Sequence, residues 1–240
     1  MLTVEDLNRN LLEEWTKSLE HINKEEKIAL YNLGILVTNN GIDCLYDIHK
    51  SLVKHNQSMY ILDGKLGYEL QEDEFLLKIQ DMNINLNYYH LNEIIHGLID
   101  ILEEIYPLGT VVELKTEYLK RGLAIKDIET AQVMIIGRFI YQKDIKSYFQ
   151  YAGVVYPLGL IGEGKVIQFT SKLIEKVIHK GFCDEKDNGY IYLMKKELII
   201  DNKMHSFGFS SNDERSQYSN KIKEGGVNSD DKGRNRGIKK

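Results

Sequence analysis

The stretch Y-A-G-V-V-Y-P-L-G-L-I-G, residues 151–162, decides how this sequence is divided into elements. It contains Pro157, one of only two prolines in the chain, and the other, Pro107, stands in the same four-residue context, Tyr-Pro-Leu-Gly. Proline fixes φ and favours extended backbone in the residue before it, while glycine two places later permits a left-handed turn. Each Tyr-Pro-Leu-Gly therefore predicts a corner between two elements of structure.

Between and after the two corners, the residue types and the two-residue period are those of β-strands. Residues 132–141 are almost all apolar, which predicts a central strand covered on both faces, and Gly137 within it indicates a bend or bulge. Four more strands and one helical turn are expected at residues 110–115, 148–156, 166–170 and 177–182, with the turn at 171–175. The pattern predicts a small five-stranded, SH3-like antiparallel sheet or barrel with a closing helix at 189–200.

Upstream of Pro107 the pattern is mainly helical. Apolar residues recur at helical spacing over residues 3–22, 24–37, 42–55 and 91–105. Thr3 followed by Asp6 is a weak form of the capping box that begins a helix. Residues 56–86 are mixed, because Asp63-Gly64 indicates a hairpin and the residues after it alternate as in a strand.

The composition changes again after residue 200. Residues 210–240 are mostly Ser, Asn, Asp, Gly and Lys, with almost nothing to bury, and so are expected to be disordered. The sequence thus predicts an α+β protein with three regions. They are a mostly helical N-terminal region at 1–105, a small β domain at 106–200 and a disordered polar tail at 201–240.

The amino-acid composition and the N-terminal sequence indicate where in the cell the protein is expected. The 240 residues are 42% hydrophobic and 28% charged, with a net charge of −5, which is ordinary for a soluble protein. Cys44 and Cys183 lie far apart and are expected to be reduced thiols. The acidic N-terminus is unlike a signal peptide, and no apolar run is long enough for a membrane span. We therefore expect a cytoplasmic protein.

No motif in the sequence indicates catalysis, a metal or a cofactor. The seven histidines are scattered, and none stands in a zinc-binding spacing with another histidine or a cysteine; His90 and His96, for example, are six places apart. The glycines between Gly159 and Gly164 lack the G-K-[ST] ending of a phosphate loop and precede a predicted strand. We therefore predict no catalytic residue, no metal site and no cofactor.

Six residues around the second corner are candidates for binding a partner protein. Arg138 is a charge within an apolar strand, where it needs a partner, and tyrosine is enriched at interfaces. The candidates are Arg138, Tyr148, Tyr151, Tyr156, Pro157 and Leu158. Two other readings stay open, that Arg138 points outward or pairs with Glu113 or Glu175, and that at least one of the tyrosines packs in the core.

Four blocks of sequence, in order and spacing, resemble the Gram-positive domain-of-unknown-function family 4176. The blocks are P-L-G-T-V-V from Pro107, V-M-I-I-G-R from Val133, Y-A-G-V-V-Y-P-L-G from Tyr151, and residues 169–181. The resemblance covers about residues 106–200. It implies association with type VII secretion loci, whose other products include small helical secreted proteins and toxins, and it supplies no catalytic residues.

The resemblance and the missing catalytic motifs together predict a non-enzymatic accessory protein of type VII secretion. Its partner would be a helical secreted protein or the targeting domain of a toxin, for which it would act as a chaperone or targeting factor. One alternative is an immunity protein that blocks a toxin. Another is a nucleic-acid-binding SH3-like module, which the charge disfavours, because the nine Lys/Arg and six Asp/Glu of residues 201–240 leave the rest of the chain at −8.

Overall fold

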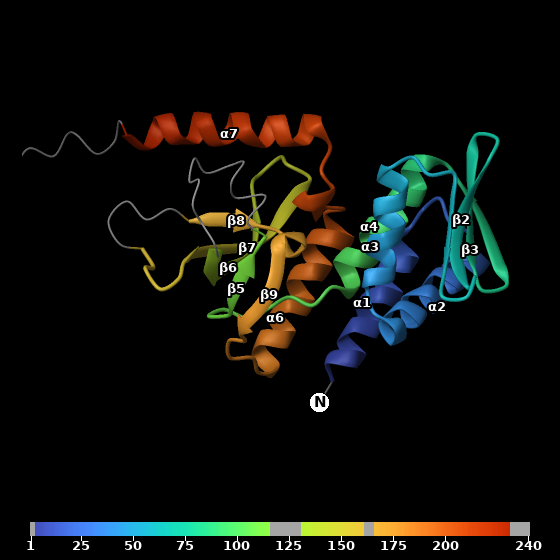
Figure 1. The fold of residues 1–240 in the computed structure, drawn as a ribbon, viewed down its shortest axis with the longest axis horizontal. Helices are drawn as coiled ribbons and strands as arrows, with labels where there is room; N and C mark the ends of the chain where they lie inside the picture. Colours follow the sequence, from blue (N-terminus) through green and yellow to red (C-terminus); the bar gives the residue numbers. More distant parts are fainter. Residues whose placement is uncertain (1–2, 116–130, 161–165, 231–240) are drawn as a thin grey trace, which may run out of the picture. The chain divides into compact units, whose positions relative to one another are not determined.

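The computed structural model describes residues 3–115, 131–160 and 166–230, with the backbone alone for 222–230. The chain forms two compact units, each built from two segments. Unit 1 is Met1–Val111 with Val177–His205, and unit 2 is Val112–Lys176 with Ser206–Lys240. The divisions predicted near residues 105 and 200 were drawn from changes of composition along the chain. The two units are defined by contacts between residues, and each therefore combines two segments that are distant in the sequence (Figure 1).

Unit 1 contains five α-helices in its described part. They are α1 (Val4–Ser18), α2 (Lys24–Asn40), α3 (Asp43–Val53), α4 (Tyr88–Leu102) and α6 (Glu185–Lys195), which continues as a π-helical turn, η2 (Lys196–Asp201). The predicted capping box of α1 is confirmed, because the Thr3 side chain accepts a hydrogen bond from the Asp6 amide and the Asp6 carboxylate accepts one from the Thr3 amide. Asn23 and Asn87 cap α2 and α4. The N-terminal helices predicted from the sequence are therefore confirmed.

A four-stranded antiparallel meander separates α3 from α4. Its strands are β1 (Ser58–Ile61), β2 (Leu66–Gln71), β3 (Glu74–Ile79) and β4 (Met82–Leu86), paired in chain order. The predicted hairpin at Asp63-Gly64 is confirmed, with both residues at positive φ. The next two turns place Glu72 and Gln80 at positive φ. Because neither is Gly or Asn, the sequence lacked the usual turn signal there, and β4 was not predicted.

Unit 2 is organised by a six-stranded sheet that includes strands crossing the unit boundaries. The strands are β5 (Val111–Leu114), β6 (Ala131–Tyr141), β7 (Ser147–Val155), β8 (Ile167–Phe169), β9 (Ile174–His179) and β10 (His205–Ser206). The order is β10-β7-β6-β5-β9, and β8 also pairs with β7. The five predicted strands are present. So is the predicted helical turn before the last of these strands, as η1 (Ser171–Leu173). The predicted count of five is wrong, because β10 joins them, and the SH3-like curl stays a prediction.

The centre of the sheet differs in one respect from the sequence prediction. A register shift between Ile135 and Gly137 confirms the expected bulge in β6. However, β7 is the strand that is buried along all but its last residue, whereas Ile136 of β6 is 39% exposed. The apolar run of β6 was therefore wrongly read as doubly covered. The strand covered on both sides carries Tyr148, Gln150 and Ala152, a more polar sequence.

The segment after residue 201 is ordered where it was predicted to be disordered. It forms β10, a 3-10 turn η3 (Phe207–Phe209) and α7 (Asn212–Asp230). Tyr218 is 5% exposed, and its ring centroid lies 5.2 Å from that of Phe149 and 5.1 Å from that of Phe207. A few aromatic residues are thus enough to anchor a segment whose average composition is polar. Residues 231–240, the last part of the predicted tail, lie outside the described residues.

The remaining sequence predictions concern the closing helix and membrane-spanning segments. The predicted closing helix at 189–200 exists as α6 and η2, and these residues belong to unit 1. Residues 116–130, which join the first two predicted strands of the β domain, lie outside the described residues. Among the described helices, none combines the length and the apolar composition needed to cross a membrane.

Candidate functional site

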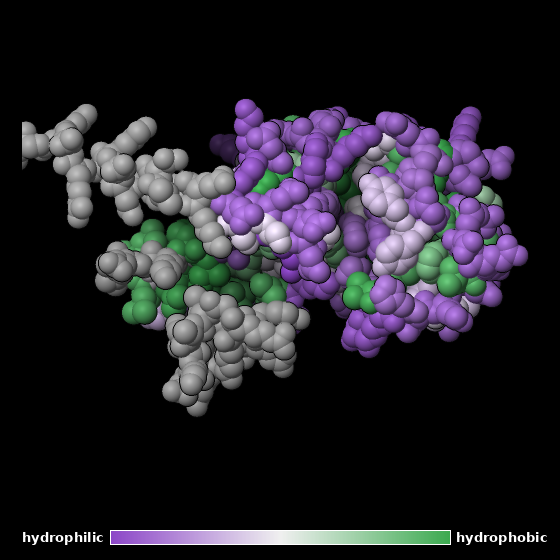
Figure 2. Space-filling view, turned by 90° about the horizontal axis from the view of Figure 1, so that it is seen from above, coloured by the Kyte–Doolittle hydropathy of each residue, from purple (hydrophilic) through white to green (hydrophobic). Residues whose placement is uncertain are grey.

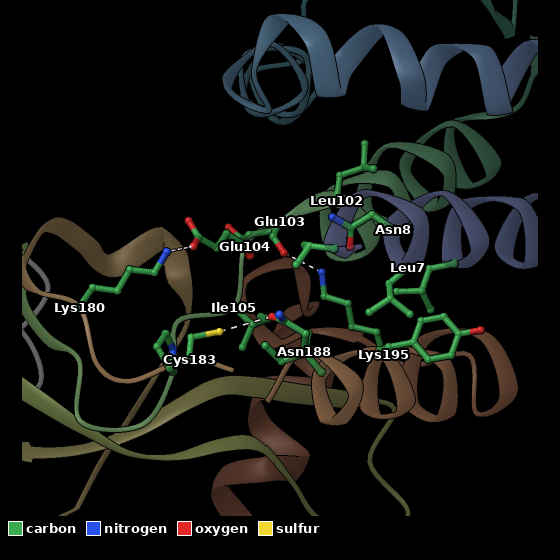
Figure 3. Close-up of a pocket in the computed structure, with 15 residues that line it drawn as sticks. Leu7, Asn8, Leu102, Glu103, Glu104, Ile105, Lys180, Cys183, Asn188 and Lys195 are labelled. Carbon is green, nitrogen blue, oxygen red and sulfur yellow. Dashed lines mark hydrogen bonds and ion pairs between the residues drawn. The ribbon is translucent and has the colours of Figure 1, made fainter. Parts of the chain in front are cut away.

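A cavity in unit 1 lies between α1 and α6 (Figure 3). We call it the α1–α6 groove; its volume is about 390 Å³. Its walls come from α1, from the chain after α4 and from the segment that leads into α6. The lining residues are Val4, Leu7, Asn8, Leu11, Leu102, Glu103, Glu104, Ile105, Pro107, Lys180, Cys183, Asn188, Ile191, Tyr192 and Lys195.

The two helical walls have the same spacing. Four residues of α1, from Val4 to Leu11, and four of α6, from Asn188 to Lys195, line the groove at intervals of three, one and three places. Residues three and four apart lie on one face of a helix, so each wall is a continuous stripe about two turns long. Each wall therefore presents one row of side chains to the groove, in which Leu7, Leu11 and Ile191 are apolar.

Glu14 joins the two helices just beyond the groove. Its carboxylate accepts hydrogen bonds from the Tyr192 hydroxyl, at 3.0 Å, and from the Lys196 ammonium. The bond from Lys196 is the main cause that lowers the pKa of Glu14. This three-residue contact ties the middle of α1 to the end of α6 and so sets the separation of the two walls.

Lys195 lies at the floor of the groove and is 2% exposed. Its ammonium donates hydrogen bonds to the backbone carbonyls of Ile101, at 2.7 Å, and Glu103, at 2.6 Å. These carbonyls are at the C-terminal end of α4, where the helix leaves acceptors without helical donors and carries partial negative charge. Burial lowers the pKa of Lys195 to about 8, against an ordinary value of 10.5. The lysine thus caps α4 from the side of the groove.

The other polar groups at this end of the groove are held by one another. The ammonium of Lys180 forms an ion pair with Glu104, and the thiol of Cys183 donates to the side-chain oxygen of Asn188 at 3.4 Å (Figure 3). Burial is the largest cause that raises the pKa of the Cys183 thiol, followed by Asp187. A cysteine nucleophile needs a lowered pKa, so the environment of Cys183 is the reverse of an activating one.

The first Tyr-Pro-Leu-Gly corner builds part of the groove wall. Pro107 is buried and lines the groove, while Gly109 takes a φ of +80° that completes the turn. The Thr110 hydroxyl donates to the Pro107 carbonyl at 2.7 Å and accepts a hydrogen bond from the Gly181 amide at 3.0 Å. A Cβ on Gly181 would lie 2.1 Å from the Leu108 carbonyl oxygen, so only glycine allows this approach.

The second corner is a turn as well. The six residues predicted to bind a partner differ in their exposure to solvent. Tyr156, Pro157 and Leu158 are exposed, whereas Tyr148 and Tyr151 are buried at 1% and 0%. Tyr151 packs against Phe169, as the core reading of the tyrosines allowed. Arg138 is half-buried and stands opposite Tyr151 in the β6–β7 register. The six candidates therefore do not form one surface, and only three of them are exposed.

Hydrophobic side chains are also exposed in unit 2. Figure 2 shows green, hydrophobic surface gathered on the part of the molecule that holds the sheet. Exposed hydrophobic residues of this unit include Ile136, Tyr141, Val155, Tyr156, Leu158, Leu160 and Val166. The exposed end of the second corner thus belongs to a larger group of apolar residues.

The sequence did not predict the α1–α6 groove. Its walls are separated by most of the chain, and no local pattern links the start of α1 to α6. One signal was present, because Lys180 lies in the last predicted strand, Cys183 follows that strand and Pro107 marks the first corner. That signal could be used only once the corner and the segment around Gly181 were known to be adjacent.

Comparison with protein-family models gives a match that covers part of this groove. Residues 105–189 match the model described as a domain of unknown function, DUF4176. The resemblance of the Pro107–Gly181 blocks to that family is therefore confirmed. Five lining residues fall within the matched segment, namely Ile105, Pro107, Lys180, Cys183 and Asn188. Searches of curated proteins and of solved structures gave no match.

Proposed function

We propose that this chain is a non-catalytic accessory protein that binds another polypeptide through the α1–α6 groove. The observation that carries the proposal is the form of the groove, with two helical stripes facing an open apolar space. An amphipathic helix packs into such a space by placing its own residues, three and four apart, between the ridges of both walls. The occupant that fits is therefore an amphipathic helix of a partner protein.

The exposure of the α1 stripe supports a partner. Val4 is 51% exposed although it shares the stripe with Leu11, which is 1% exposed. The stripe thus passes from the core of unit 1 to the surface and is apolar except at Asn8. Burial of such residues against an apolar helix contributes about 25 cal/mol per Å² of apolar surface removed from water.

The polar end of the groove supports recognition rather than catalysis. The ammonium of Lys195 is engaged by the carbonyls of α4, and the pKa of Cys183 is raised. Lys180 and Glu104 are exposed and paired at the rim, where they can exchange partners with charged residues of an incoming helix. These features favour an adaptor over an enzyme.

The resemblance to the family supports a proposal about the process in which this protein binds its partner. We propose that it acts in the cytoplasm with type VII secretion, as a chaperone or targeting factor. Its partner would be a small helical secreted protein or the helical targeting domain of a toxin. Such partners offer amphipathic helices, which is the chemistry that the groove accommodates.

The test is co-expression of the chain with each product of the adjacent genes, followed by size-exclusion chromatography. We expect one helical product to co-elute with the wild type. Ile191→Glu places a charge in the groove wall and should weaken that complex at least tenfold. The matched control is Leu193→Glu on the same helix, which is 62% exposed and does not line the groove. It should leave binding unchanged.

The same experiment distinguishes binding in the groove from binding at the second Tyr-Pro-Leu-Gly corner. Loss of the complex in Leu158→Glu, with full binding by Ile191→Glu, would place the site at Tyr156, Pro157 and Leu158 instead. Separate elution of every pair with the wild type would contradict the proposed function itself.

A further inference from the structure

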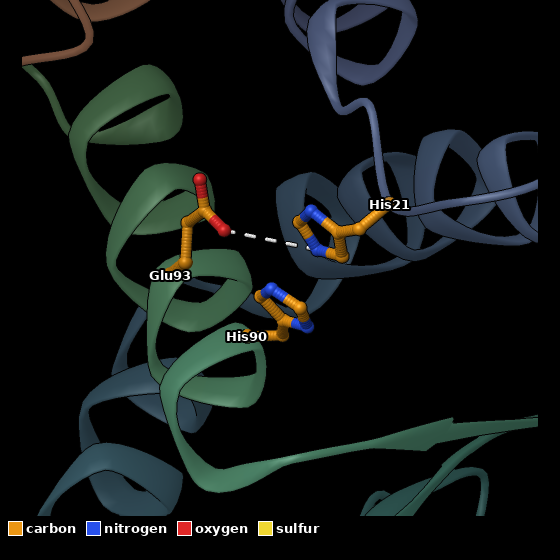
Figure 4. Close-up of side chains that lie close together, drawn as sticks. All are labelled: His21, His90 and Glu93. Carbon is orange, nitrogen blue, oxygen red and sulfur yellow. Dashed lines mark ion pairs between the residues drawn. The ribbon is translucent and has the colours of Figure 1, made fainter.

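Three side chains able to bind a metal ion meet in unit 1, away from the α1–α6 groove residues (Figure 4). His21 lies in the turn between α1 and α2, while His90 and Glu93 are three places apart near the start of α4. The ligand atoms of the three residues all lie within 4.8 Å of one another. The sequence predicted no metal site, because His21 is distant from the other two along the chain.

We infer that His21, His90 and Glu93 form a binding site for a zinc-like divalent transition-metal ion. Two imidazole nitrogens and one carboxylate oxygen are a donor set that zinc uses, with water in the fourth position. Imidazole ligands favour zinc, copper or nickel, whereas magnesium and calcium prefer sites made of oxygen atoms alone. The donor set therefore selects against the abundant hard cations.

The distances suit an ion of this size. His21 Nε2 lies 3.7 Å from Glu93 Oε2, which is too long for a hydrogen bond. Two ligand atoms of a tetrahedral zinc ion, each about 2.0–2.1 Å from the metal, lie about 3.3 Å apart. A small movement of either side chain is enough to bring this pair to the separation that zinc requires.

The imidazole rings must also move. The rings of His21 and His90 face each other in Figure 4, and they are stacked with centroids 3.8 Å apart and planes 11° apart. The nitrogen lone pairs of stacked rings lie in two parallel planes, so one ring has to rotate about its Cβ–Cγ bond for both to bind one ion. That torsion is broad for a histidine, and His21 is on a turn.

Charged groups of both signs surround the imidazole of His21. Glu93 and Glu26 both act on His21 with negative charge, and Lys27 and His90 oppose them. Partial burial of the imidazole is the largest cause that acts on the pKa of His21, and it lowers that pKa.

Occupation of the site would link the turn after α1 to α4. Because α1 forms one wall of the groove, a bound ion would hold that wall more firmly at its C-terminal end. The direct consequence is thermodynamic, since an ion that binds only the folded state raises the melting temperature.

The experiment uses the full chain without an affinity tag, stripped of metal with a chelator. Zn²⁺ is titrated by calorimetry, and Co²⁺ is followed by the visible absorption of its four-coordinate form. We expect one Zn²⁺ per chain in the wild type, no binding of Mg²⁺, and a melting temperature that rises with Zn²⁺.

His21→Gln, His90→Gln and Glu93→Gln should each weaken Zn²⁺ binding at least tenfold and abolish the rise in melting temperature. His179→Gln is the matched control, because His179 is an exposed histidine of β9 outside the cluster, and it should bind as the wild type does. Circular dichroism confirms that each variant is folded. Absence of Zn²⁺ binding by the wild type, or binding that survives in His90→Gln, would overturn the inference.

Discussion

Gly97 of α4 and Gly189 of α6 are both glycines inside helices, yet the structure gives them opposite roles. A Cβ on Gly97 would lie 2.4 Å from the indole of Trp15, which is itself 4% exposed, whereas a Cβ on Gly189 would meet nothing within 4 Å. The sequence showed only the intrinsic cost of glycine in a helix, because the neighbour of Gly97 comes from another helix. Close packing of α1 on α4 is what requires glycine there.

We therefore predict opposite effects for one substitution at these two sites. Gly97→Ala should lower the free energy of unfolding by about 1–3 kcal/mol, the usual cost of overpacking a core. Gly189→Ala should raise it by about 0.5–1 kcal/mol through helix propensity alone. Urea unfolding followed by circular dichroism measures both, and stabilisation by Gly97→Ala would show that α1 does not pack on α4 as described.

Lys195 gives a prediction about pH. Its pKa is about 8 in the folded protein and 10.5 ordinarily, so between these values the unfolded chain binds more protons. Stability contributed by this residue must then rise as pH rises through that window, by up to about 3 kcal/mol at about 1.4 kcal/mol per pKa unit. The difference in unfolding free energy between the wild type and Lys195→Met should change by this amount from pH 7 to pH 10.5. A difference that is constant with pH would contradict the burial of the ammonium.

At the scale of elements, the sequence was informative wherever the local pattern agreed with the final environment. The capping box at Thr3, the hairpin at Asp63-Gly64 and the bulge at Gly137 were each visible in a few residues. The sequence prediction failed at a turn that has no glycine and in a segment whose order depends on contacts with distant residues. The turn at Gln80 has no glycine, and the segment after residue 201 owes its order to aromatic residues that pack on β7.

The order of α7 can be tested through Tyr218. Tyr218→Ala removes a buried ring that packs on Phe149 and Phe207 and should destabilise unit 2 by about 3 kcal/mol. Limited trypsin digestion should then cleave after Arg215 and Lys221 much faster than in the wild type. The exposed neighbour Gln217 provides the control, since Gln217→Ala should be cleaved as slowly as the wild type. Equal and rapid cleavage of all three would support the original expectation of a disordered tail.

At the scale of the whole molecule, the candidate site could not be read from the sequence because its parts come from both ends of unit 1. The family match covers 105–189, a range that begins in unit 1, passes through unit 2 and returns to unit 1. The matched segment supplies one end of the groove, while α1 lies outside the match and supplies the opposite wall. We propose that this composite groove, and neither wall alone, binds a helix of a partner protein.

Cys183 allows the most direct test of that claim, because it lines the groove and is exposed, whereas Cys44 of α3 lies outside it. The rate at which each thiol is alkylated is measured by mass spectrometry, with and without a co-eluting partner. We predict that the partner slows alkylation of Cys183 at least tenfold and leaves Cys44 unchanged. A complex in which Cys183 reacts as fast as in the free chain would contradict binding in the α1–α6 groove.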